Sequence, residues 1–79
     1  MIAKEELERL VKAALPDAWV EARDLTGQAD HYELHVVSAA FEGRSLVERH
    51  RMVYAPLAEP LKGPLHALSL KVHTPKEKG

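Results

Sequence analysis

The stretch "HYELHVVS", residues 31–38, alternates apolar and polar side chains with the period of two that is typical of a half-buried strand. The apolar face is formed by Tyr32, Leu34 and Val36. The polar face is formed by His31, Glu33 and His35. The alternation predicts a strand with one face on a core and the other face turned to solvent.

Two other stretches show a similar alternation. "AWVEARDL", residues 18–25, alternates loosely, and "LHALSLKVHT", residues 65–74, alternates cleanly. The five residues "TGQAD" at 26–30 have the length of a hairpin connection, so we expect a β-hairpin over residues 18–38. We expect the last strand over residues 66–74.

Helical patterns occupy most of the remaining chain. Residues 1–15 carry an apolar stripe at helical spacing, and Pro16 ends it. Two helices are expected over residues 45–62, because Ser45 followed by Glu48 has the spacing of a capping box. The first of the two is expected to bury Leu46, Val47, His50, Val53, Tyr54 and Leu57.

The resulting element order is α-β-β-α-α-β in one domain, residues 1–79, with a flexible polar tail at 75–79. We expect an α+β fold in which helices cover one face of a three-stranded mixed sheet. This order is similar to the type II KH topology. KH domains clamp nucleotides with a GXXG loop, which this sequence lacks, so RNA binding does not follow from the topology.

Composition excludes several kinds of chemistry. The chain has no cysteine, which rules out disulfides, thiolate catalysis and an all-cysteine metal site. No catalytic arrangement of side chains is recognisable, so we do not expect an enzyme. No apolar run is long enough for a membrane span, and the first residues form no signal peptide, so we expect a cytoplasmic protein without a membrane partner.

The five histidines fall into three groups. His50 lies on an apolar helix stripe, where a histidine is more often structural than a ligand. His35 and His73 fall on the outer faces of their strands and are most simply solvated. They would approach each other on neighbouring strands, as a poor two-ligand site. His31 and His66 each open a strand, and a parallel pairing of these strands would bring them to one end of the sheet, as structural residues or as metal ligands.

Arg44, Arg49 and Arg51 give the second half of the chain a modest basic character. Residues 41–79 hold seven basic and four acidic residues, against four and eight in residues 1–40. These arginines could form a solvated face, form ion pairs, bind an acidic partner or contact phosphates. The net charge of −1 argues weakly against nucleic acid.

The segments "VVSAAFEGRSLVERHRMVY" (36–54) and "HALSLKVHTP" (66–75), with the lead-in "DLTGQADHYEL" (24–34), resemble the BolA-like family. The likeness extends from about residue 18 to residue 75 and implies an α-β-β-α-α-β fold. It also implies a heterodimer with a monothiol glutaredoxin that shares a [2Fe-2S] cluster in iron–sulfur trafficking or iron and redox regulation. Some bacterial members are described as DNA-binding transcriptional regulators of stress response and cell morphology.

The resemblance assigns candidate ligands residue by residue. The histidine of the family's "HAL" motif is a cluster ligand, which carries over to His66. The second family ligand comes from the loop between the first two strands, where "TGQAD" has no thiol, so His31 is the replacement. A [2Fe-2S] cluster needs four ligands, and histidine can replace two cysteines on one iron, so the partner must bring thiolates. A glutaredoxin with glutathione could supply them.

Two further expectations follow from this ligand arithmetic. The isolated protein should carry no cofactor and should be a monomer or a weak homodimer. The alternative function is a DNA-binding regulator that uses the basic region Arg44–Arg51, with Arg44, Arg49 and Arg51 on phosphates.

Overall fold

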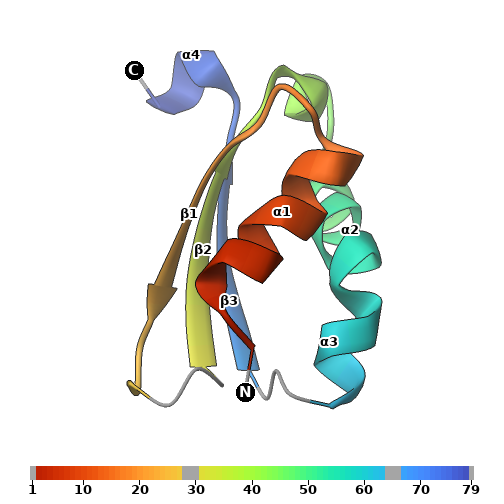
Figure 1. Ribbon diagram of the computed structural model, residues 1–79. Coiled ribbons are helices and arrows are strands. Elements are labelled where there is room, and N and C mark those ends of the chain that lie inside the picture. The colour runs from red at the N-terminus through yellow and green to blue at the C-terminus, as the bar shows by residue number, and fades with distance from the viewer. Residues whose placement is uncertain (1, 28–30, 64–66, 79) are drawn as a thin grey trace.

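The computed structural model describes residues 2–27, 31–63 and 67–78 and shows a three-stranded mixed sheet (Figure 1). The central strand β2 pairs antiparallel with β1 and parallel with β3. The strands are β1 (Trp19–Asp24), β2 (His31–Val37) and β3 (Ala67–His73). The alternation of apolar and polar residues therefore predicted all three strands correctly, and the expected mixed sheet is confirmed.

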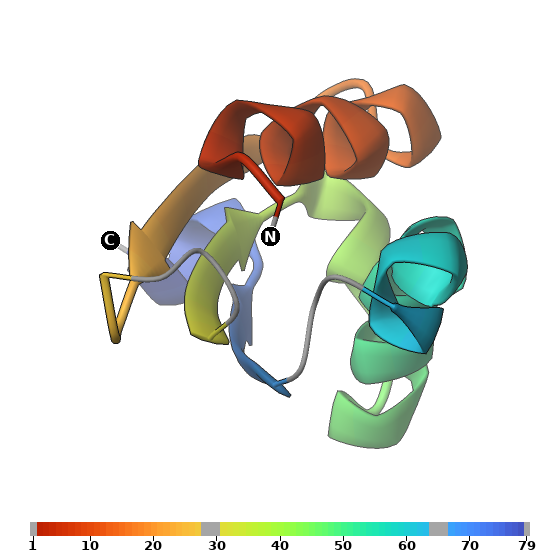
Figure 2. The ribbon, with the colours of Figure 1, turned by 60° about the horizontal axis from the view of Figure 1, so that its bottom comes forward.

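Three helices lie on one side of the sheet (Figures 1 and 2). These are α1 (Lys4–Ala14), α2 (Leu46–Tyr54) and α3 (Ala58–Lys62), with 3-10 turns η1 (Ala39–Phe41) and η2 (Ala55–Leu57). The expected α-β-β-α-α-β order and the helical layer on one face are confirmed. No helix in the described part of the chain is long and apolar enough to cross a membrane.

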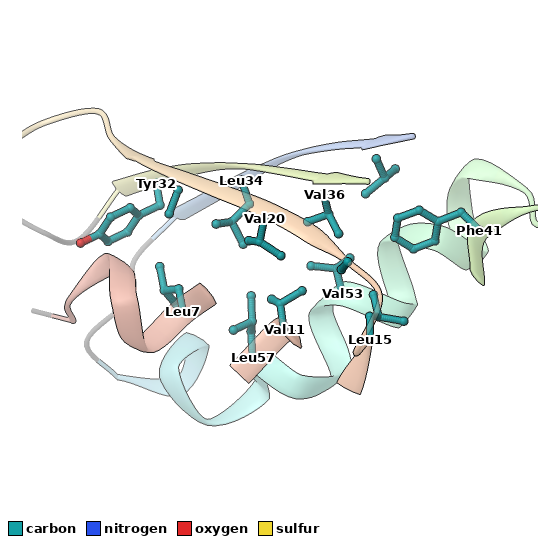
Figure 3. Packing of buried hydrophobic residues seen from close by; sticks show 13 residues of the cluster. Leu7, Val11, Leu15, Val20, Tyr32, Leu34, Val36, Phe41, Val53 and Leu57 are labelled. Carbon is teal, nitrogen blue, oxygen red and sulfur yellow. The ribbon is translucent and has the colours of Figure 1, made fainter. Parts of the chain in front are cut away.

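The core lies between this helical layer and the inner face of the sheet (Figure 3). The inner face of β2 contributes Leu34 and Val36, which are fully buried. The helical side contributes the fully buried residues Leu7, Val11, Phe41, Val53 and Leu57. Burial of these side chains is the main force that holds the layers together, at roughly 25 cal/mol per Å² of apolar surface.

The start of α2 shows one correct and one wrong prediction. The capping box is confirmed: the Ser45 Oγ accepts from the Glu48 N–H at 3.2 Å, and the Glu48 carboxylate accepts from the Ser45 N–H at 2.9 Å. Leu46 and Val47, however, are 63% and 60% exposed, so their predicted burial is wrong. Helical periodicity gives the direction in which a side chain points, but not how far along the helix its packing partners extend.

The C-terminal residues also differ from expectation. Instead of a flexible tail, Pro75–Lys78 form a short helix, α4. The Thr74 N–H donates to the Glu77 carboxylate at 3.0 Å, and the Glu77 N–H donates to the Thr74 hydroxyl at 3.3 Å. This reciprocal capping, together with an ion pair between Glu77 and Arg49, gives the tail a defined position.

Candidate functional site

His31 opens β2 at the end of the sheet where β3 also begins (Figure 1). In the parallel register its Cα partner is Ala67, and Tyr32 is paired with Leu68. Paired strands lie about 4.8 Å apart, so the two strand starts are direct neighbours. The parallel pairing of β2 and β3, on which the prediction that His31 and His66 lie at one end of the sheet depends, is therefore present. His66 itself lies outside the described residues and is joined to Ala67 by one peptide bond.

Hydrogen bonds fix both strands at this end. The buried Tyr32 hydroxyl donates to the Ile2 carbonyl at 2.6 Å, which holds the N-terminal residues beside the start of β2. The Tyr54 hydroxyl is 3.4 Å from the carbonyl oxygen of Leu68 near the start of β3. His31 is half-buried at this rim, so part of the residue remains accessible.

The donor set at this end is incomplete in the part of the chain that the structure describes. No group of three or more histidine, cysteine, aspartate or glutamate side chains there could hold a metal ion. A metal site of three or more ligands at this end would therefore need groups from outside the described residues, such as His66, or from another molecule.

The side chain of Arg49, a residue of α2, joins this helix to α4. Its guanidinium donates to both carboxylate oxygens of Glu77, at 2.7 and 3.1 Å, and its Nε donates to the Arg44 carbonyl at 3.1 Å. The ring of Phe41 lies 6.0 Å from the guanidinium carbon. The hydrogen bonds that Arg49 donates to Glu77 lower the pKa of this carboxyl group to about 2, with a further contribution from the Thr74 N–H. Only 14% of the Arg49 side chain is exposed.

The other two arginines have different surroundings. Arg44 lies 3.8 Å from the Glu48 carboxylate in an exposed pair, and Arg51 is exposed on α2. Hydrogen bonds from the Ser45 backbone and side chain lower the pKa of Glu48, with a smaller contribution from Arg44. The structure therefore does not present all three arginines equally: Arg44 and Arg51 face solvent, whereas Arg49 is held by Glu77.

The remaining histidines lie away from the His31 end. His50 is half-buried, and its ring meets Tyr54 edge-on at a centroid distance of 6.2 Å, so its structural role stays a prediction. His35 and His73 do approach each other on the outer face of the sheet, at a centroid distance of 6.3 Å.

The capping and ion-pair contacts of Glu77 were not predicted from the sequence. It follows Thr74 by three positions, which is the spacing that identified the Ser45–Glu48 capping box. That signal was available in the sequence. Its ion pair with Arg49 was not, because the two residues are 28 positions apart.

The chain is similar to several known proteins. The family described as BolA-like protein matches residues 11–77. The protein RP812 of Rickettsia prowazekii is 40% identical over 70 residues, which cover 89% of this chain and 91% of that protein. The DNA-binding transcriptional regulator BolA of Escherichia coli is 34% identical over an alignment of 84 positions, which covers 98% of this chain and 80% of the regulator. BolA-like protein 1 of Pongo abelii is longer, and this chain spans 39% of it.

The fold has the same relatives. The structure of a BolA homologue from Coxiella burnetii matches with a TM-score of 0.83 at 32% identity, over 99% of this chain and 97% of the homologue. The family match covers most of the chain, and the match to the solved homologue shows that the two proteins share a fold. The protein belongs to the BolA-like family.

Proposed function

We propose that this protein is an adaptor that binds a monothiol glutaredoxin and shares a [2Fe-2S] cluster with it, in iron–sulfur trafficking or iron and redox regulation. His66 and His31 would be its cluster ligands. The observation that carries the proposal is the parallel register of β2 and β3, in which His31 stands opposite Ala67, the residue after His66.

The chemistry of the donor set fits half of such a cluster. His31 and His66 would supply two imidazole ligands, as histidines do in Rieske centres, and such ligation would raise the reduction potential of the cluster. Because the chain has no cysteine, the sulfur ligands must come from the partner. His31 is partly accessible at the rim, beside the hydrogen bond between Tyr32 and Ile2, and this position suits a ligand that must meet a second protein.

A visible circular dichroism titration tests the proposal. A [2Fe-2S]-loaded monothiol glutaredoxin is titrated anaerobically with this protein and with its His66→Ala and His31→Ala variants. We expect a changed cluster spectrum that saturates near one equivalent and is lost with His66→Ala. The His31 variant then identifies the second ligand.

His50→Ala is the histidine control, since His50 lies on α2 and at neither strand start. It should leave the titration unchanged. A cluster spectrum that the wild-type protein does not alter, or that all variants alter equally, would remove both histidines from the ligand set.

A second candidate function is DNA binding, which the similarity to the E. coli regulator favours. In this protein the contacts would come from the exposed Arg44 and Arg51, while Arg49 is engaged by Glu77. Phosphate contacts of this kind give an affinity that falls steeply with salt. Fluorescence anisotropy with a DNA duplex at two salt concentrations should then show a weaker salt dependence for Arg44→Ala and Arg51→Ala. If both variants bind DNA as the wild type does, with the same salt dependence, this candidate is rejected.

A further inference from the structure

A second pair of histidines lies on the outer face of the sheet, which α1, α2 and α3 leave open (Figure 1). His35 comes from β2 and His73 from β3. His35 is paired with Lys71, and His73 is paired with Val37, so the two histidines are diagonal neighbours across the parallel pair. Their ring centroids are 6.3 Å apart and their planes are inclined by 80°.

The surroundings of the pair favour a ligand role. The side chain of His35 is 34% exposed, and His73 is half-buried, so an ion from solvent can reach both. The Glu33 carboxylate lies 3.9 Å from the Nε2 of His35. This separation is longer than a hydrogen bond, so the carboxylate does not fix the ring, and the Nδ1 of His35 is left for an ion.

Lys71, a cation that lies next to the pair, is held away from His73. Lys71 lies in register with His35, and its ammonium is 3.3 Å from the Glu33 carboxylate. Glu33 precedes His35 along β2, whereas His73 follows Lys71 along β3. The ammonium is therefore held on the side of the His35–Lys71 row that is away from His73.

The spacing of the two rings suits a single ion. Transition metals lie about 2.0–2.1 Å from an imidazole nitrogen and therefore about 3 Å from the ring centroid. Two rings with centroids 6.3 Å apart can be bridged by one ion after small side-chain rotations. We propose that His35 and His73 chelate one borderline divalent transition-metal ion, of the class of Cu²⁺, Ni²⁺ or Zn²⁺, with water in the remaining positions.

This site is separate from the cluster site proposed above. Val37, which lies beside His73, is six residues along β2 from His31, or about 20 Å at the rise of a strand. Across the described residues no group of three or more candidate ligands exists, so the pair is a two-ligand chelate. Its presence does not depend on a glutaredoxin or on a cluster.

Trp19 provides a local reporter. It is the only tryptophan in the chain and is 44% exposed. Its Cα partner is Val37, which in turn is paired with His73, so Trp19 and His73 lie two strand spacings apart, or about 10 Å. Bound Cu²⁺ quenches tryptophan fluorescence at this range and far less at the distance of His31.

The test is a titration of the full chain with Cu²⁺, followed by Trp19 fluorescence, for the wild type and the His35→Ala, His73→Ala and double variants. We expect saturable quenching in the wild type. Each single variant should weaken the Cu²⁺ affinity by about tenfold or more, because the second imidazole binds intramolecularly, and the double variant should lose the remaining binding at this site. His31→Ala and His50→Ala are the controls and should titrate like the wild type.

Two results would overturn the proposal. Quenching that is unchanged in both single variants would place the ion elsewhere. Single variants that each lose about half the amplitude at unchanged affinity would show two independent imidazoles and no chelate. Far-UV circular dichroism of each variant, which should match the wild type at these surface positions, keeps loss of fold from imitating loss of binding.

Discussion

The two faces of β2 show how differently neighbouring residues are used. Leu34 is fully buried against the helical layer, whereas His35, the next residue, is 34% exposed on the open face. The inner face is apolar and closely packed, and the outer face is held by exposed ion pairs such as Lys71 with Glu33. The stability of the protein therefore resides on the inner face, and the outer face can carry binding groups at little cost.

The largest expected effect comes from a substitution on the inner face. Leu34→Ala removes a fully buried side chain from the centre of the core and should lower the free energy of unfolding by about 2–5 kcal/mol. Urea denaturation measures this change. His35→Ala is the matched control on the outer face, with an expected change within about 0.5 kcal/mol. Similar losses for the two variants would end the distinction between the faces.

The Arg49–Glu77 pair gives a smaller, pH-dependent effect. Its hydrogen bonds lower the folded-state pKa of Glu77 from 4.5 to about 2. A depressed carboxyl pKa contributes stability that is fully present above pH 4.5 and is lost as the pH falls towards 2. Glu77→Gln should therefore lower the thermal midpoint at pH 7 by less than Leu34→Ala does, and the difference from the wild type should shrink below pH 4.5. A difference that stays constant down to pH 2 would contradict the ion pair.

The polar contact at the rim of the inner face should contribute less. Tyr32→Phe keeps the buried ring but removes the hydroxyl that donates to the Ile2 carbonyl. We expect a loss of about 0.5–1.5 kcal/mol in unfolding free energy. Amide hydrogen exchange should also increase in the first turn of α1 relative to the wild type. An unchanged exchange rate there would mean that the bond does not hold the N-terminal residues.

The smallest effect is expected on the outer face. Lys71→Ala removes a side chain that is 59% exposed and pairs with Glu33. Its contribution should be about 0.5 kcal/mol or less and should fall as salt screens the pair. Denaturation at low and high salt checks this, and a loss above 1 kcal/mol would assign the outer face a structural role.

The sequence predicted the faces of the strands well because side-chain direction in a strand alternates strictly. That parity placed Leu34 inward and both His35 and His73 outward, as observed. It was less informative for α2, where Leu46 and Val47 have the right angular position but lie on the first turn, beyond the packed surface. A helix is buried only where another element covers it, and that coverage is a tertiary property.

The candidate sites show the same limit. The start of β2 at His31 was recognisable from sequence, and β3 begins at Ala67, one residue after His66, but the parallel register had to come from the structure. An ion pair was only one of several alternatives predicted for Arg49, because nothing in the local sequence links Arg49 to Glu77. Contacts between residues distant in sequence decided which arginine is structural and which two remain exposed.

The parallel pairing of β2 and β3 also has a consequence for the order of folding. The β1–β2 hairpin joins sequence neighbours, but β3 reaches β2 only after η1, α2, η2 and α3 have been synthesised and folded back. Such long-range pairing closes late, because the entropy of the intervening loop must first be overcome. During synthesis, a chain that has emerged only as far as α3 holds His31 and His35 without the β3 side of either histidine pair. Both proposed histidine pairs can therefore form only after β3 has been synthesised.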